Sequence, residues 1–165
     1  MQCAVLVAAT LMEPLPARAE SVTKSDTFSA WTVYTDAATP HAFCFVTSEP
    51  TAKDPEGATR DAPRIYISAW PKDGVKAEVS LRMGFPVKAA ASSNATVGDA
   101  AFALFSNETR LYVKDATAEL KLIDAMKKGA SLKVDATSER GTKITDTYSL
   151  NGFAQALSKL QADCR

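Results

Sequence analysis

Residues 131–150 read SLKVDATSERGTKITDTYSL, and this stretch decides the fold class of the chain. In its first half, apolar residues take every second position and polar residues stand between them (Leu132, Val134 and Ala136). Alternation with a period of two is typical of a strand that buries one face. Gly141 follows as a turn residue, and residues 142–150 return with the same period. The stretch therefore predicts an antiparallel hairpin.

Upstream of this hairpin, the period of two recurs in short segments that are separated by Gly, Pro, Asn and Ser. These segments predict strands at residues 30–34, 42–46, 64–70, 75–83, 87–88, 101–105 and 110–113. Residues 48–63 interrupt them as a polar loop that contains three prolines. Many short strands joined by turns predict a mainly β protein, an antiparallel β-sandwich or barrel-like single domain.

Two segments flanking the hairpin change to a helical period. In residues 116–128, apolar side chains stand three or four positions apart, acidic residues lie near the start, and a lysine pair precedes Gly129. This order of charges complements the helix dipole, and glycine commonly ends a helix. In residues 151–163 the apolar positions form one stripe that continues to Cys164. We therefore expect two short helices, at about 116–128 and 151–163.

The composition is that of one folded domain without a dominant charge. The chain has 165 residues, 46% of them hydrophobic and 23% charged, with 19 basic and 19 acidic side chains. Such a length and hydrophobic content support a buried core and exclude a wholly disordered chain. Because the net charge is zero, the overall electrostatics favour neither nucleic acid nor an anionic membrane as the partner.

The first 19 residues are expected to be a signal peptide. The apolar run at 3–12 is too short to span a bilayer, and Ala17 and Ala19 are small residues where signal peptidase requires them. A buried N-terminal helix is the alternative, and the prolines within 13–16 would break it. With cleavage after Ala19, residues 20–165 are expected to form a single β-rich domain in the periplasm. No later segment is apolar for long enough to be a transmembrane helix.

Removal of the leader leaves two cysteines, Cys44 and Cys164. In an oxidising compartment an even pair is most simply one disulfide, which here would tie the C-terminal helix to an early strand. The position of Cys164 on the apolar stripe favours the same pairing. Two alternatives stay open. One is a pair of free structural thiols, and the other is a reactive Cys44 assisted by His41, for which the sequence offers no group that orients the imidazole.

Asp146 breaks the alternation of the returning strand. Ile144 and Tyr148 flank it on the face that should be buried. A bare carboxylate in such a place costs several kcal/mol, so we expect a buried structural carboxylate. It would hold a turn or pair with an arginine, for which the candidates are Arg60, Arg64 and Arg140. A catalytic role would need a second carboxylate or a histidine nearby, and the sequence names none.

Several blocks of the sequence resemble one family of bacterial proteins. They are CFVTSEP at 44–50 with Pro55, Arg60 and Pro63 downstream, GFPVK at 84–88, DAMKKG at 124–129, TSERGT at 137–142 and TDTYSLNGF at 145–153. Together they resemble the invasion-associated locus B family over essentially all of residues 20–165. The resemblance implies an exported protein of Gram-negative bacteria with a signal peptide and a β-rich body. It also implies a link to host-cell invasion through the founding member, and it implies no catalytic residues.

No motif for catalysis, cofactor binding or metal binding stands out in the sequence. One histidine and two widely separated cysteines do not make a metal-ligand cluster, and the glycines are scattered singly. No serine lies in a G-x-S-x-G elbow. We therefore predict no enzyme activity, no cofactor and no metal site.

The leading expectation is a non-enzymatic periplasmic or surface interaction protein, whose partner is an unidentified protein or envelope component. Residues 48–63 are the expected partner-binding loop, because a loop of this length is often functional. Its charged side chains are the candidate contacts, namely Glu49, Lys53, Asp54, Glu56, Arg60 and Asp61. An alternative of equal weight is that its prolines only shield a strand edge.

The second function class is a periplasmic binder of a small ligand or envelope component. Its pocket would lie between the sheet and the C-terminal helix, lined by aromatic side chains such as Trp31, Tyr66, Trp70 and Tyr148. The same residues are also typical of a core. An apolar cavity with convergent polar groups would favour the binder, and a closed core would favour the interaction protein.

Overall fold

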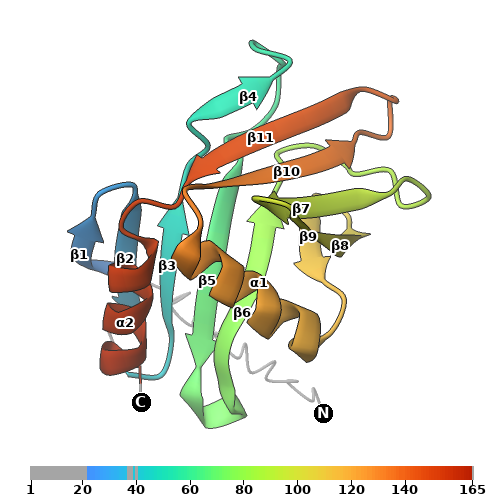
Figure 1. The fold of residues 1–165 in the computed structure, drawn as a ribbon. Coiled ribbons are helices and arrows are strands. Elements are labelled where there is room, and N and C mark those ends of the chain that lie inside the picture. The colour runs from blue at the N-terminus through green and yellow to red at the C-terminus, as the bar shows by residue number, and fades with distance from the viewer. Residues whose placement is uncertain (1–21, 37–38, 40, 165) are drawn as a thin grey trace, which may run out of the picture.

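Eleven strands form one continuous antiparallel sheet in the computed structural model, which describes residues 22–36, 39 and 41–164 (Figure 1). The strands are β1 (Val22–Phe28), β2 (Trp31–Asp36), β3 (Cys44–Ser48), β4 (Ala52–Asp54), β5 (Arg64–Trp70), β6 (Val75–Arg82), β7 (Ser93–Val97), β8 (Ala100–Asn107), β9 (Arg110–Val113), β10 (Ser131–Thr137) and β11 (Lys143–Ser149). The helices are α1 (Ala116–Lys128) and α2 (Phe153–Asp163), with a short 3-10 turn at Pro71–Asp73. The predicted signal peptide, residues 1–19, lies outside the described residues.

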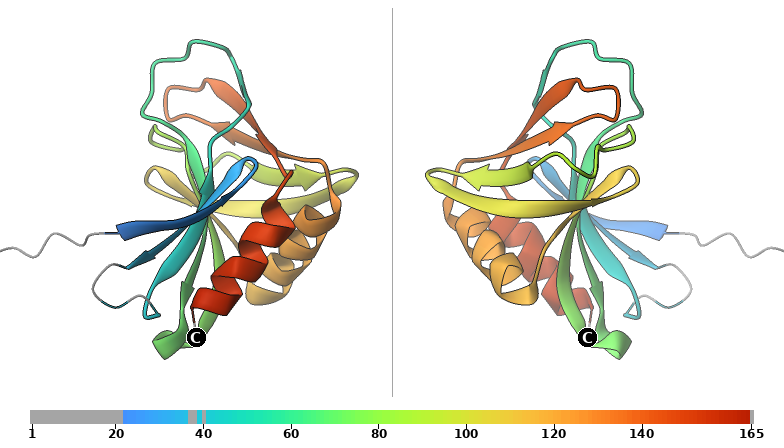
Figure 2. Two further views of the ribbon diagram at one scale, coloured as in Figure 1. Left: turned by 90° about the vertical axis from the view of Figure 1, so that its left-hand side faces the viewer. Right: turned by 90° about the vertical axis from the view of Figure 1, so that its right-hand side faces the viewer.

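The strand order is β1-β2-β3-β5-β6-β9-β8-β7-β10-β11-β4, so the sheet is open, with β1 at one edge and β4 at the other. It bends along this order, and β10, β11 and β4 pass across the ends of β3 and β5 (Figure 1). Both helices lie on one face of the sheet, which we call the inner face (Figure 2). The predicted class, mainly β and antiparallel with two short helices, is confirmed, and the strands belong to a single sheet.

The inner face carries the core. Trp31 packs against Phe153 of α2 with ring centroids 4.8 Å apart, and its indole N–H donates to the Ser149 carbonyl at 3.0 Å. Burying a large apolar side chain contributes about 1.5–3 kcal/mol, so this ring contact helps to hold α2 on the sheet. The largest buried side chains besides these are Tyr148, Ile65, Ile67, Leu81, Met83, Leu111, Leu122, Met126, Leu132 and Leu157.

Local chemistry fixes the helix ends. Helix α1 has the predicted bounds, and the Asp115 side chain caps it by accepting a hydrogen bond from the Ala118 N–H at 2.9 Å. At the other end, the Gly129 N–H donates to the Ala125 carbonyl at 2.9 Å. Helix α2 starts at Phe153, slightly later than predicted, because Gly152 before it has a left-handed backbone with a φ of 87°. Among the described residues, no helix has the length and hydropathy needed to cross a membrane.

Strands β1, β4 and β7 are absent from the sequence prediction. Their residues are mostly polar or small, so a period of two has no apolar face to reveal, and pairing with neighbouring strands makes them extended. The predicted strand at 87–88 is reduced to one bridge between Val87 and Ser138. The prediction that residues 48–63 are a loop throughout is corrected, because this segment contains strand β4, which pairs with β11.

Candidate functional site

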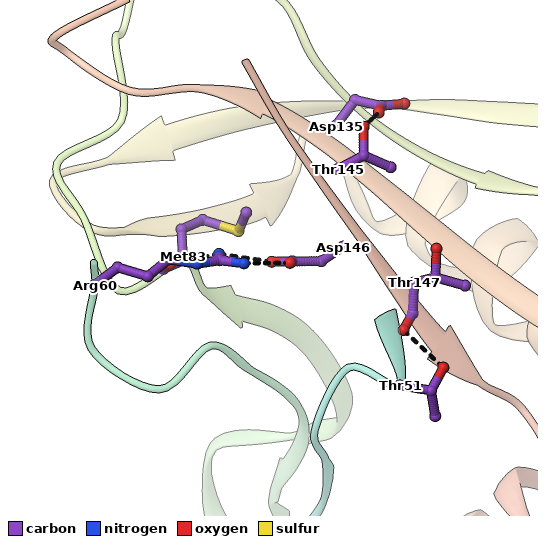
Figure 3. Close-up of polar contacts among 7 residues, drawn as sticks. All are labelled: Thr51, Arg60, Met83, Asp135, Thr145, Asp146 and Thr147. Carbon is purple, nitrogen blue, oxygen red and sulfur yellow. Dashed lines mark hydrogen bonds and ion pairs between the residues drawn. The ribbon is translucent and has the colours of Figure 1, made fainter. Parts of the chain in front are cut away.

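A buried ion pair fixes the loop between β4 and β5 to the rest of the molecule. Arg60 reaches inward from the loop, and Asp146 meets it from β11 (Figure 3). Nη1 of Arg60 donates to Oδ2 of Asp146 at 2.8 Å and to the Met83 carbonyl at 3.0 Å, while Nη2 donates to Oδ1. The side chains of Arg60 and Asp146 are 4% and 0% exposed. Of the three arginines that the sequence offers to Asp146, the fold selects Arg60.

A second contact holds the same part of the loop against the segment that follows β6. The Asp61 N–H donates to the Gly84 carbonyl at 3.1 Å, and the Arg60 guanidinium lies 5.7 Å from the centre of the Phe85 ring. Gly84 has a φ of 77°, and a Cβ built there would lie 2.0 Å from the Asp61 carbonyl oxygen. Only glycine allows the two backbones to approach this closely.

Strand β4 anchors the other end of the loop. The Thr51 N–H donates to the Thr147 carbonyl at 2.7 Å, and the Thr51 hydroxyl donates to the same oxygen at 3.1 Å (Figure 3). Ala52 and Asp54 then pair with Thr147 and Thr145 of β11. Residues 55–59 therefore span two fixed points, one on β11 and one at the ion pair.

Beside residues 55–59 lies a cleft of about 620 Å³. Its walls are residues 55–60, residues 84–86 and the turn region 138–144 between β10 and β11. The Glu139 N–H donates to the Pro86 carbonyl at 3.0 Å, which joins the second wall to the third. The lining residues are Pro55, Ala58, Thr59, Arg60, Gly84, Phe85, Pro86, Ser138, Glu139, Arg140, Thr142 and Ile144. Apolar surface with a few polar groups converging on it is typical of a recognition site.

The structure separates the six charged residues that were predicted as partner contacts. Five of the six are exposed, namely Glu49, Lys53, Asp54, Glu56 and Asp61. Glu49 forms an ion pair with Arg64 of β5. The side chain of Arg60 is almost fully buried against Asp146, because an ionised carboxylate inside the fold needs a counter-charge. Arg60 is therefore a structural anchor, and its prediction as a surface contact is corrected.

The four aromatic residues considered for a ligand pocket do not share one. Trp31 and Tyr148 are fully buried in the core. Tyr66 and Trp70 are half-buried and pack among other aromatic rings on the opposite face of the sheet. These four rings therefore do not form a pocket between the sheet and the C-terminal helix.

Tyr148 lies close to the ion pair. Burial raises the pKa of its phenol far above the ordinary value, and the negative charge of Asp146 adds to the rise. Its hydroxyl has no hydrogen-bond partner among the described residues. The phenol therefore stays protonated and neutral at physiological pH.

The structure contains a disulfide between Cys44 of β3 and Cys164, which directly follows α2, with the two Cα atoms 5.9 Å apart. Because both sulfur atoms are in this bond, neither is a free nucleophile. The alternative assistant, His41, has its Nδ1 next to the Asp163 carbonyl instead. A disulfide of this kind indicates an oxidising compartment outside the cytoplasm.

The chemistry of the cleft suits binding. Its lining offers hydroxyl groups from Thr59, Ser138 and Thr142, one carboxylate from Glu139 and the guanidinium of Arg140. No histidine or cysteine is among the lining residues. Within the part of the chain that the structure describes, no three side chains of His, Cys, Asp or Glu gather as metal ligands would.

Sequence reasoning finds one wall of the cleft and misses the other two. Residues 55–60 belong to the predicted loop, whereas 84–86 and 138–144 are far from it in the sequence. The blocks at 84–88 and 137–142 carry a usable signal, because the sequence resemblance already singles them out together with Pro55 and Arg60. Their meeting at one cleft is visible only in the fold.

Comparisons with known proteins show which family and which solved structure the chain resembles. The family model described as "Invasion associated locus B (IalB) protein" matches residues 31–161. No curated protein matches the chain. The crystal structure of invasion associated protein B from Bartonella henselae is similar in fold, with a TM-score of 0.60 and 20% sequence identity over 83% of this chain and 95% of that one. The chain belongs to the invasion associated locus B family.

Proposed function

We propose that this domain is an exported, non-enzymatic interaction protein of the periplasm or cell surface, which recognises its partner at the cleft beside residues 55–59. The observation that carries the proposal is the fixed loop. Arg60 and β4 hold its two ends, while exposed charges and the cleft lie along its outside. The family name connects these proteins with invasion, and recognition of an envelope or host component by an exported protein is consistent with that name.

A fixed loop favours binding for an energetic reason. Ordering a loop upon association costs conformational entropy, and a loop that is ordered beforehand avoids that cost. Here the buried ion pair, the close approach at Gly84 and the pairing of β4 order the loop in the free protein. The cleft is therefore prepared for a partner with both apolar and polar groups.

Site-specific photo-crosslinking tests this proposal. A photoreactive amino acid is placed at Thr59 or Arg140, which line the cleft, and as a control at Lys121, which is exposed on α1. The protein is irradiated in the periplasm of a Gram-negative host and with envelope extract. We expect the same adduct from both cleft positions and not from Lys121. Adducts from Lys121 alone would place the binding surface elsewhere.

A pair of charge reversals provides the matched control. Arg140→Glu changes the charge at the cleft, and Lys128→Glu makes the same change at an exposed position at the end of α1. We expect Arg140→Glu to abolish most of the adduct formed at Thr59 and Lys128→Glu to leave its yield unchanged. Equal yields in both variants would contradict recognition at the cleft.

A further inference from the structure

The face of the sheet opposite the helices, the outer face, carries a row of three arginines. Arg64 of β5 is in register with Arg82 of β6, and Arg82 is in register with Arg110 of β9. The neighbouring residues, such as Leu81 beside Arg82, are buried in the core, so the arginine side chains lie on the outer face. Adjacent strands are about 4.8 Å apart, which places the three side chains within a strip about 10 Å wide.

This row is electrostatically unfavourable for the isolated domain. Like charges directly opposite each other on neighbouring strands destabilise a sheet. Glu49 pairs with Arg64, but among the described residues no ion pair involves Arg82 or Arg110. Arg82 donates to the Ala62 carbonyl at 2.8 and 3.1 Å, and Arg110 lies 5.4 Å from the ring centre of Tyr66. These contacts orient the guanidinium groups without neutralising them.

A cluster of aromatic rings lies beside the arginine row. Tyr34, Phe43, Phe45, Tyr66 and Trp70 form an unbroken chain of ring contacts with centroids 5.1 to 5.8 Å apart, which we call the aromatic cluster. Tyr112 and Phe105 form a further pair at 5.6 Å, in the same cross-strand row as Tyr66. Phe105 is 48% exposed. The helices pack on the other side of the sheet, so none of them covers these rings (Figure 2).

The ring geometry favours a protein as the occupant. Bases of single-stranded nucleic acid and sugar rings stack on free aromatic faces. Here the faces of Tyr34 and Phe45 stack on each other at 14°, those of Phe43 and Trp70 at 23°, and the Tyr66 face is covered by Arg110. These contacts cover one face of each of these rings and so leave fewer free faces for stacking, and Tyr, Trp and Arg are the residues enriched at the centres of protein interfaces.

The outer face also has a suitable size. Six adjacent strands, from β2 through β3, β5, β6 and β9 to β8, contribute to it. At about 4.8 Å per strand spacing and about 3.3 Å per residue, it measures about 25 by 20 Å. This footprint of about 500 Å² is the size that one partner contributes to a small, transient interface.

We propose that the outer face binds a protein partner that presents acidic side chains to the row of Arg64, Arg82 and Arg110 and apolar side chains to the aromatic cluster and Phe105. None of these arginines or rings lines the cleft, and binding at the outer face does not depend on the function proposed for the cleft. The charge of the row selects the partner. An acidic surface complements this row, whereas a surface that presents arginines to it is repelled.

A defined peptide tests the chemistry of the surface. The probe is a short fluorescent peptide that alternates glutamate with phenylalanine and leucine, and its matched counterpart carries lysine in place of glutamate. We expect the full chain to bind only the glutamate peptide in a fluorescence anisotropy titration, with an affinity that falls as salt is added. The double variant Arg82→Glu/Arg110→Glu should weaken binding by about tenfold or more, and Phe105→Ser should weaken it as well.

The control variant Lys133→Glu/Lys143→Glu makes the same change in net charge at exposed positions of β10 and β11, and it should bind as the parent does. If the arginine reversals disturb folding, Arg82→Gln/Arg110→Gln removes the charges without reversing them and should still weaken binding.

A sulfated polysaccharide and a single-stranded oligonucleotide are titrated in parallel. Binding of either in preference to the glutamate peptide, or equal affinity of parent and arginine variants, would overturn the proposal. Arg140→Glu should leave peptide binding unchanged, which separates this result from the test of the cleft.

Discussion

Removal of the Asp146 carboxylate should cost a large part of the stability of the fold. In Asp146→Ala, the Arg60 guanidinium stays buried without a counter-charge, and its Nε already has no hydrogen-bond partner. Breaking a buried pair by removing one partner costs about 3–5 kcal/mol, so we expect the free energy of unfolding to fall by about that amount. Urea denaturation followed by circular dichroism measures it.

Two comparisons make the Asp146 result specific. Asp135→Ala removes an exposed carboxylate from the partner strand β10 and should change stability by less than about 1 kcal/mol. The double variant Arg60→Met/Asp146→Leu removes both charges and should recover much of the loss. A single variant as stable as the parent would mean that the ion pair does not form.

Gly84 should be irreplaceable for a different reason. In Gly84→Ala the new Cβ would overlap the Asp61 carbonyl, so the loop must move away in addition to the cost of a left-handed alanine. Gly141 has a φ of 88° and open space around it, so Gly141→Ala bears only the backbone cost of about 1 kcal/mol. We expect Gly84→Ala to lower the melting temperature more than Gly141→Ala and to speed proteolysis within residues 55–59. Equal effects would show that the close approach contributes nothing.

At the scale of single residues, the sequence predicts that Asp146 is buried and must be paired, but it does not predict which arginine pairs with it. Asp146 stands between Ile144 and Tyr148 in an apolar alternation, so its burial is predictable. Its partner is not, because Arg60, Arg64 and Arg140 are equivalent until the course of the loop is known. The loop brings Arg60 inward, while Arg64 lies on the outer face and Arg140 in the turn at the cleft.

At the scale of elements, local signals decide what can be predicted. Helix α1 combines an aspartate cap, an apolar stripe and a terminal glycine, and its bounds follow from the sequence alone. Strand β4 has no such signal, because Ala52, Lys53 and Asp54 are all exposed and become a strand only by pairing with β11. Short polar edge strands are defined by their neighbours, so periodicity cannot find them.

Glu119 links α1 to β6, and it should make stability depend on pH. Its Oε1 accepts a hydrogen bond from the Val79 N–H at 2.7 Å. Burial raises the pKa of Glu119 in spite of that bond, and the charge of Glu78 adds to the rise. A raised pKa means that the favourable contribution is complete below the unfolded-state pKa and is lost as pH rises through the folded-state pKa.

Glu119→Gln keeps an acceptor for Val79 and cannot ionise, so the variant should be more stable than the parent at pH 7. The difference should shrink as the pH falls through the raised pKa of Glu119 and should be gone below about 4.3, the ordinary value for a glutamate, because the parent is then neutral in both the folded and the unfolded state. Urea denaturation at several pH values measures this. Asp124→Asn, at an exposed position of the same helix, serves as the control and should show no such gap. A gap of opposite sign would mean that the ionised carboxylate is favoured in the fold.

At the scale of the whole molecule, the arrangement of the strands is beyond local pattern. The order β6-β9-β8-β7-β10-β11-β4 brings residues 52–54 beside 145–147 and makes a cleft from three distant segments. Nothing in the period of any one strand specifies which strand it pairs with. The family resemblance names the blocks at 84–88 and 137–142, but it does not predict that they meet at one cleft.

The disulfide acts at this largest scale, because it joins residues that are 120 positions apart. It ties the end of α2 to β3 and so closes most of the described chain into one loop. Chain-entropy estimates give such a crosslink about 4–5 kcal/mol of stabilisation, an upper figure because strain in the folded state subtracts from it.

We therefore expect Cys164→Ser to lower the melting temperature strongly. The reduced parent should melt where Cys44→Ser/Cys164→Ser melts, since each lacks only the bond. Mass analysis without reductant should show no free thiol in protein produced in the periplasm. A melting temperature unchanged by reduction would show that packing of α2 alone holds the C-terminal end on the sheet.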